Sequence, residues 1–143
     1  MFVETRDDSR EFFLRVWRKM GSGDAMEPLE TLIAQVITEH PEFHAILENP
    51  AHALEAEYAS PDQRPNPFLH MGLHIALVEQ LQTDRPQGIR VVYQHLLARC
   101  ANDAHSVQHR MIDCLAKALH EASDRGGVPD QYAYLAHLQR LSA

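Results

Sequence analysis

The sequence predicts an all-α protein, and three observations support this fold class. Prolines and small polar residues divide the 143 residues into segments of helical length. No segment shows sustained alternation of apolar and polar residues, so we predict no β-sheet. Glycines follow two of the helical segments, at Gly21 and at Gly126. Because the connections are short, we expect one antiparallel helical bundle of about five to seven helices over residues 1–143.

The N-terminal part contains two clear amphipathic segments. The first runs over residues 9–20 and the second over 28–39, where Pro28 stands at the first helical position. Short helices are expected after Pro41 and Pro50. One face of the first segment is strongly apolar and carries Phe12, Phe13, Val16, Trp17 and Met20.

The C-terminal part contains four longer helical segments. Residues 58–65 form the clearest loop, and Asn66 is placed to cap the helix that follows it. The residues Asp84 to Gln87 have the form of a capping box, which predicts a helix from Pro86. The expected helices cover residues 67–82, 86–100, 103–125 and 129–141.

The segment 68–81 differs from the others because its apolar residues cover almost the whole helix circumference. A helix that is apolar on all sides is typical of the centre of a bundle. His70 and His74 share one face of this segment, one helical turn apart. We therefore expect both imidazoles to be buried, and a buried imidazole needs polar partners.

Composition excludes several classes of protein. Two cysteines are too few for a disulfide scaffold, and 45% hydrophobic residues supply one ordinary core. The net charge of −7 disfavours binding to nucleic acid or to an anionic membrane surface. The N-terminal residues show no secretory signal pattern, and no apolar run is long enough to span a bilayer. We expect a cytoplasmic protein with no nucleic-acid partner and no membrane partner.

Ten histidines are the unusual feature of the composition, and six of them form pairs four residues apart. On one helix this spacing puts two imidazoles on one face, where both can bind one metal ion. Pro41 interrupts the first pair, so that His40 is expected to end one helix and His44 to begin the next. The three pairs are His40/His44, His70/His74 and His105/His109.

Carboxylates near these pairs affect the choice of metal. Imidazole suits zinc, nickel and iron, whereas added oxygen ligands favour iron or manganese. Asp113 continues the stripe of His105 and His109, and Glu48 lies four residues after His44. Glu30 lies near a helix start, where the helix dipole favours it, but it also shares a face with apolar residues and could point inward. This ligand set resembles that of haemerythrin only loosely, because the spacings differ.

Four segments together resemble a bacterial domain-of-unknown-function family, number eighteen forty-one. The resemblance extends over most of the chain, and the stretch Asn66-Pro-Phe-Leu-His70 is its most specific part. It implies a single small helical domain and a motif that includes the paired histidines, but it brings no activity with it. The segments begin at His40, Asn66, Asp84 and His105.

Two hypotheses about function follow. In the first, the bundle binds a transition metal (Zn, Fe or Ni) through His70 and His74, joined by His105 and His109 or by His44, with a carboxylate as ligand or orienting group. In the second, the histidines are structural and the protein is a non-catalytic interaction module, such as a homo-oligomer formed through the face of Phe12, Phe13 and Trp17. The sequence contains no nucleophile elbow, phosphate loop or dinucleotide fingerprint, so it names no catalytic residue and no organic cofactor.

Overall fold

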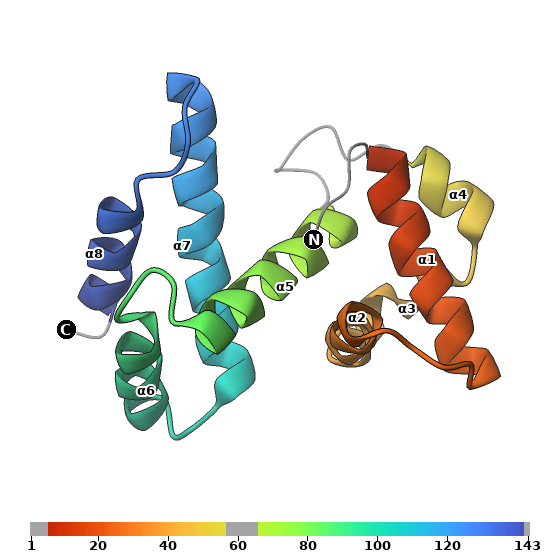
Figure 1. Cartoon of the computed structure of the whole chain (residues 1–143), viewed down its shortest axis with the longest axis horizontal. Helices are drawn as coiled ribbons and strands as arrows, with labels where there is room; N and C mark the ends of the chain where they lie inside the picture. The colour runs from red at the N-terminus through yellow and green to blue at the C-terminus, as the bar shows by residue number, and fades with distance from the viewer. Residues whose placement is uncertain (1–5, 57–65, 142–143) are drawn as a thin grey trace. The chain divides into compact units, whose positions relative to one another are not determined.

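The computed structural model describes residues 6–56 and 66–141, and all regular structure in these ranges is helical (Figure 1). The predicted all-α class is therefore confirmed. The loop predicted at 58–65 lies outside the described residues. The elements are α1 (Arg6–Ser22), α2 (Pro28–Thr38), the 3₁₀ helix η1 (Pro41–Phe43), α3 (His44–Leu47), α4 (Pro50–Glu55), α5 (Pro67–Thr83), α6 (Ile89–Arg99), α7 (Ala104–Arg125) and α8 (Gln131–Leu141).

The chain divides into two compact units, Met1–Ile75 and Ala76–Ala143. Helix α5 contributes residues to both, and its apolar residues are spread around its circumference as the sequence predicted. The arrangement of one bundle around residues 68–81 stays a prediction.

The core of the first unit forms where α1 packs on α2, α3 and α4. The N-terminal part of α5 adds Phe68, Met71 and Ile75 to this core, and the Phe68 ring lies 5.9 Å from that of Phe13. The other buried members are Leu14, Val16, Ile33, Val36, Ile37, Leu47 and Ala53.

The aromatic face of α1 serves this same core. Phe13 is fully buried, and Phe12 and Trp17 pack partly buried against the core residues. Burial within the unit explains why these apolar residues recur at helical spacing, and it removes Phe13 from any surface that a second copy could contact. A homo-oligomer formed through the rest of this face stays a prediction.

Local sequence signals start the helices of the first unit as expected. Pro28, Pro50 and Pro67 each occupy the first helical position, where a missing N–H leaves no hydrogen bond unmade. The side chain of Asn66 caps α5 by accepting hydrogen bonds from the backbone N–H groups of Phe68 (3.0 Å) and Leu69 (3.2 Å). The cap orients the first turn of the helix that carries His70 and His74.

In the second unit, α6 and α8 pack on each other and both pack on α7. The predicted helix start at Pro86 is wrong, because α6 begins at Ile89 after a left-handed Gly88 with φ of 100°. Asp84 does not form the predicted box with Gln87. Its Oδ1 instead accepts from the backbone N–H groups of Gly88 (3.3 Å) and Arg90 (3.1 Å), so the carboxylate caps α6 from further back in the sequence than the motif predicts.

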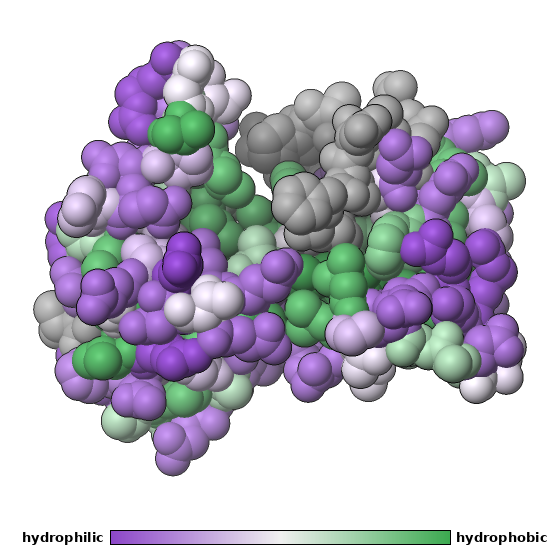
Figure 2. All heavy atoms as spheres, viewed as in Figure 1, coloured by the Kyte–Doolittle hydropathy of each residue, from purple (hydrophilic) through white to green (hydrophobic). Residues whose placement is uncertain are grey.

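Hydrophilic side chains dominate the face of the molecule drawn in Figure 2. Large exposed apolar residues among the described ones are Leu69, Val91, Leu119, Val128 and Tyr132. None of the helices in the described ranges has the length and apolar character needed to cross a membrane.

Candidate metal centre

His40 is positioned by the end of α2. Its backbone N–H donates to the carbonyl of Ile37 (3.0 Å), and its fully buried ring lies with Nδ1 2.8 Å from the carbonyl oxygen of Val36. Because a carbonyl can only accept, Nδ1 carries the proton. The lone pair of the neutral ring is therefore on Nε2, the nitrogen that a metal would bind.

His70 and His74 bring two further imidazoles to this ring from α5. The His40 ring centroid lies 4.9 Å from that of His70 and 5.1 Å from that of His74. The interplanar angles are 75° and 87°, so both rings meet His40 edge to face. His74 is fully buried and His70 partly buried. One member of the first predicted pair thus meets both members of the second, within one unit.

The nitrogens of His40 and His70 are close enough to be brought onto one ion. One ligand nitrogen of each lies within 4.8 Å of the other, and the Nε2 atoms of both rings are buried. Two nitrogens bound at about 2.0–2.1 Å in tetrahedral geometry lie roughly 3.3–3.4 Å apart. The two nitrogens would have to lie closer together than the 4.8 Å upper limit to share one ion in that geometry.

Phe43 and Glu39 complete the surroundings, and sequence reasoning had assigned neither to the site. The Phe43 ring stacks on the His40 ring, with a centroid distance of 5.5 Å and an interplanar angle of 3°. It meets the His70 ring edge to face, with a centroid distance of 5.8 Å. A Glu39 carboxylate oxygen lies 3.6 Å from Nε2 of His74. The only sequence signal for these two residues is their position: Glu39 directly precedes His40, and Phe43 directly precedes His44.

The chain matches the model of the family described as Domain of unknown function (DUF1841) over residues 5–140. It belongs to this family. No curated protein and no solved structure gives a significant match.

The most specific DUF1841-like stretch of the sequence, residues 66–70, now has a physical explanation. Asn66 caps α5, Pro67 is its first residue, and Phe68 packs into the core of the first unit. His70 follows on the face that meets His40. The stretch therefore starts the helix, anchors it, and directs an imidazole toward the cluster.

His44 has different surroundings from His40. Its Nε2 lies 2.8 Å from the carbonyl oxygen of Ile37, so that Nε2 carries the proton and Nδ1 the lone pair. The ring packs against the indole of Trp17, with centroids 4.8 Å apart. The fold thus separates the environments of the first predicted pair, as the intervening Pro41 suggested.

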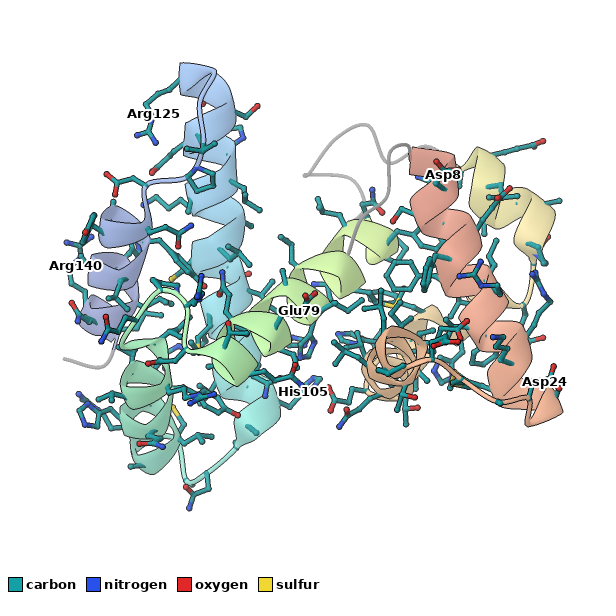
Figure 3. All side chains as sticks on the ribbon, in the orientation of Figure 1. Asp8, Asp24, Glu79, His105, Arg125 and Arg140 are labelled. Carbon is teal, nitrogen blue, oxygen red and sulfur yellow. The ribbon has the colours of Figure 1, made fainter. Side chains whose placement is uncertain are left out.

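His105 and His109 are neighbours on α7, with ring centroids 4.1 Å apart. His105 is exposed near the start of the helix (Figure 3), and His109 is partly buried. Asp113, one turn further along α7, is exposed. The prediction that this pair completes a site with the other histidines stays a prediction, because all three residues belong to the second unit.

The two other predicted carboxylates have structural surroundings of their own. Glu30 points inward and is almost fully buried, where it accepts from the backbone N–H of Glu27 (2.8 Å) and from Lys19 Nζ (2.9 Å), with Arg15 Nε at 3.5 Å. The Glu27 hydrogen bond, and after it the Lys19 contact, lowers the pKa of Glu30. Glu48 is exposed at the end of α3.

Proposed function

We propose that this protein binds a transition-metal ion at the imidazole cluster of His40, His70 and His74. The observation that carries the proposal is that three rings from two separate segments meet. The His40 ring centroid lies 4.9 Å from that of His70 and 5.1 Å from that of His74, and the rings of His40 and His74 are fully buried. Burying several imidazoles is unfavourable unless their nitrogens have polar partners or a metal. His40 and His70 are the proposed ligands, and the adjacent His74 is the proposed third ligand.

The groups around the cluster suit this role. Metal-binding histidines commonly donate their second nitrogen to a carbonyl or a carboxylate, which fixes the tautomer and the ring orientation. Val36 supplies such a carbonyl to His40, and Glu39 supplies a carboxylate near Nε2 of His74. Because Glu39 lies beside Nε2 of His74, we assign the other buried ring nitrogen, Nδ1, to the metal.

The donor set favours zinc or nickel. The proposed ligands are imidazole nitrogens, which suit Zn²⁺, Ni²⁺ and Fe²⁺, and Fe²⁺ binds most weakly of the three in the usual order of affinity. Two or three histidine ligands leave coordination positions for water or a small ligand. Glu30 is engaged by Glu27 and Lys19, so we assign it a structural role in α2.

The test is metal titration of protein purified without a histidine tag. We expect one Zn²⁺ or Ni²⁺ per chain, and we expect Co²⁺ to give the visible bands of a protein-bound ion. His70→Ala is the first variant because His70 is only partly buried. It should weaken binding by more than tenfold while circular dichroism stays unchanged. His120→Ala, which removes an exposed imidazole, is the control.

Metal-free protein whose melting temperature is unaffected by all three ions would contradict the proposal. Equal weakening by His70→Ala and His120→Ala would also contradict it, since binding would then reflect surface histidines. In the same titration, His109→Ala tests the sequence prediction that the third pair supplies a ligand.

A further inference from the structure

The second unit contains a groove whose chemistry differs from that of the histidine cluster. It lies between the turn that joins α5 to α6 and the start of α8, and its volume is about 820 Å³. This volume is within the range of sites that bind small organic molecules. We call this groove the amide groove. Its lining residues are Gln80, Arg85, Pro86, Gln87, Gln131, Tyr132 and Leu135.

The groove combines one positive charge with neutral hydrogen-bonding groups. Among the described residues that line it, Arg85 is the only charged one, and three others are glutamines. A guanidinium pairs best with a carboxylate or a phosphate, because its planar N–H groups match two oxygens. The lining residues include no carboxylate that could pair with Arg85 in place of a ligand.

Gln80 is oriented by a buried tyrosine. The Tyr134 hydroxyl donates to Oε1 of Gln80 at 2.8 Å. Burial raises the pKa of Tyr134, so this hydroxyl stays protonated and remains a donor at neutral pH. Because the carbonyl end of Gln80 is held in this way, its NH₂ end is the part that can donate to a ligand in the groove.

The turn that forms one wall is braced on both sides. Asp84 accepts from the backbone of Gly88 and Arg90, and the Arg90 guanidinium donates to the carbonyls of Leu81 (2.6 Å) and Gln82 at the end of α5. The residues 85–87 therefore lie between two anchored points. A wall held in place before binding reduces the ordering cost that a ligand must overcome.

The opposite wall, at the start of α8, carries an aromatic ring and an aliphatic side chain. Tyr132 is 89% exposed, although it lines the groove together with Leu135. Exposed aromatic rings beside a cavity are typical of surfaces that stack on a planar ligand.

We infer that the amide groove binds a small organic carboxylate with a flat apolar body. Arg85 pairs with the carboxylate, Gln80 donates to the polar part, and Tyr132 packs against the body. This inference does not depend on the proposed metal site, which is in the first unit.

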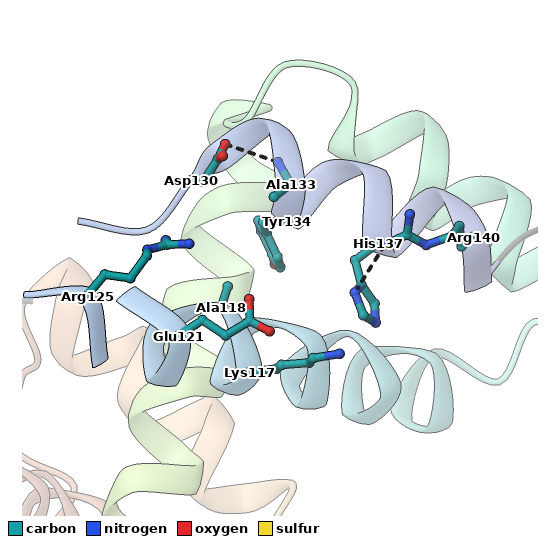
Figure 4. Close-up of a pocket in the computed structure, with 9 residues that line it drawn as sticks. All are labelled: Lys117, Ala118, Glu121, Arg125, Asp130, Ala133, Tyr134, His137 and Arg140. Carbon is teal, nitrogen blue, oxygen red and sulfur yellow. Dashed lines mark hydrogen bonds between the residues drawn. The ribbon is translucent and has the colours of Figure 1, made fainter. Parts of the chain in front are cut away.

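A smaller cavity between α7 and α8 suits such a ligand less well (Figure 4). It encloses about 230 Å³, and its lining includes the acidic Glu121 and Asp130 as well as Lys117, Arg125 and Arg140. Its volume is less than a third of that of the amide groove, and each of its cations has a carboxylate in the same lining to compete with an anionic ligand. Arg125 therefore provides a matched control for Arg85.

The experiment is a titration of the full chain with 2-naphthoate and with its neutral analogue 2-naphthamide. Calorimetry measures the affinity, and two-dimensional NMR locates the binding site. We expect saturable binding of the carboxylate, with amide binding weaker by at least tenfold. Arg85→Gln should weaken carboxylate binding by about tenfold or more, as should Tyr132→Ala. Gln80→Glu, which places a carboxylate in the groove, should abolish binding, whereas Arg125→Gln should leave it unchanged.

Four results would overturn the inference, the first three of which concern affinity. These are no saturable binding at millimolar probe, equal affinity for the carboxylate and the amide, and equal losses in Arg85→Gln and Arg125→Gln. Shifts confined to the backbone around Glu121 and His137 would also overturn it, because they would place the probe in the smaller cavity.

Discussion

The rings of His40 and His74 are nearly perpendicular, at 87°, with their centroids 5.1 Å apart in a buried environment. These two residues are far apart in the sequence, because His40 lies between α2 and η1 whereas His74 belongs to α5. A carbonyl orients one ring, and a carboxylate lies beside the other. The proposed metal site can therefore be tested by changing the carboxylate beside His74 as well as by changing the histidines.

We predict that Glu39→Gln weakens metal binding without altering the fold. The change keeps the size of the side chain but removes the charge that faces Nε2 of His74. Loss of such an orienting group typically lowers metal affinity by about 10–100-fold, and the 3.6 Å separation suggests the lower end. Zinc titration of the variant measures this effect. The control is Glu42→Gln, an exposed neighbour, and equal losses in the two variants would refute a specific role for Glu39.

The cap of α5 gives a second prediction. Asn66→Ala removes the side-chain oxygen that accepts from Phe68 and Leu69, so we expect a loss of about 1 kcal/mol in the free energy of unfolding. The first turn of α5 should then fray near His70, which would also weaken metal binding. Asn66→Asp keeps the acceptor and should retain most of both properties. The idea fails if Asp at this position is as damaging as Ala.

The sequence predicted the starts of several helices because those signals are local. Pro28, Pro50 and Pro67 act within the first turn of their own helices, so no distant contact is needed to interpret them. The start of α6 was mispredicted by three residues, since the left-handed Gly88 and the hydrogen bonds of Asp84 to residues four and six positions later are set by the turn as a whole.

The candidate site was predicted only in part for a similar reason. Spacing alone placed His70 and His74 on one helical face, and this is a local property. The approach of His40, the aromatic wall of Phe43 and the proximity of Glu39 all depend on how α2 and η1 pack against α5. A single sequence contains no direct signal for that packing.

A third prediction concerns Arg10, a buried cation that closes the end of α4. Its NH1 group donates to the carbonyls of Ala53 (2.9 Å), Leu54 (3.3 Å) and Ala56 (2.6 Å). Arg10→Met would leave these carbonyls without that donor, which should lower the free energy of unfolding by about 2–3 kcal/mol. The fluorescence of Trp17, the only tryptophan, reports unfolding of the unit that contains both residues.

Arg10→Lys should recover only part of this loss, because one ammonium group cannot match the geometry of a guanidinium. Arg18→Met, which changes an exposed arginine of the same helix, is the control and should stay within about 0.5 kcal/mol of the wild type. A similarly small effect of Arg10→Met would show that the carbonyls find other partners.

The last prediction is a pH dependence that originates at Glu30. Its pKa is lowered in the folded protein by the Glu27 backbone N–H and by Lys19, from an ordinary value of 4.5. A carboxyl with a lowered folded pKa stabilises the fold at pH values above its unfolded pKa. That stabilisation is lost as pH falls through the folded pKa. Glu30→Gln should therefore be less stable than wild type at pH 7, and the difference should shrink below about pH 4.5.

Urea unfolding followed by Trp17 fluorescence at a series of pH values measures this stability difference, with the exposed Glu11→Gln as control. A stability difference that is constant from pH 7 to the acid limit would mean that the charge of Glu30 does not stabilise α2.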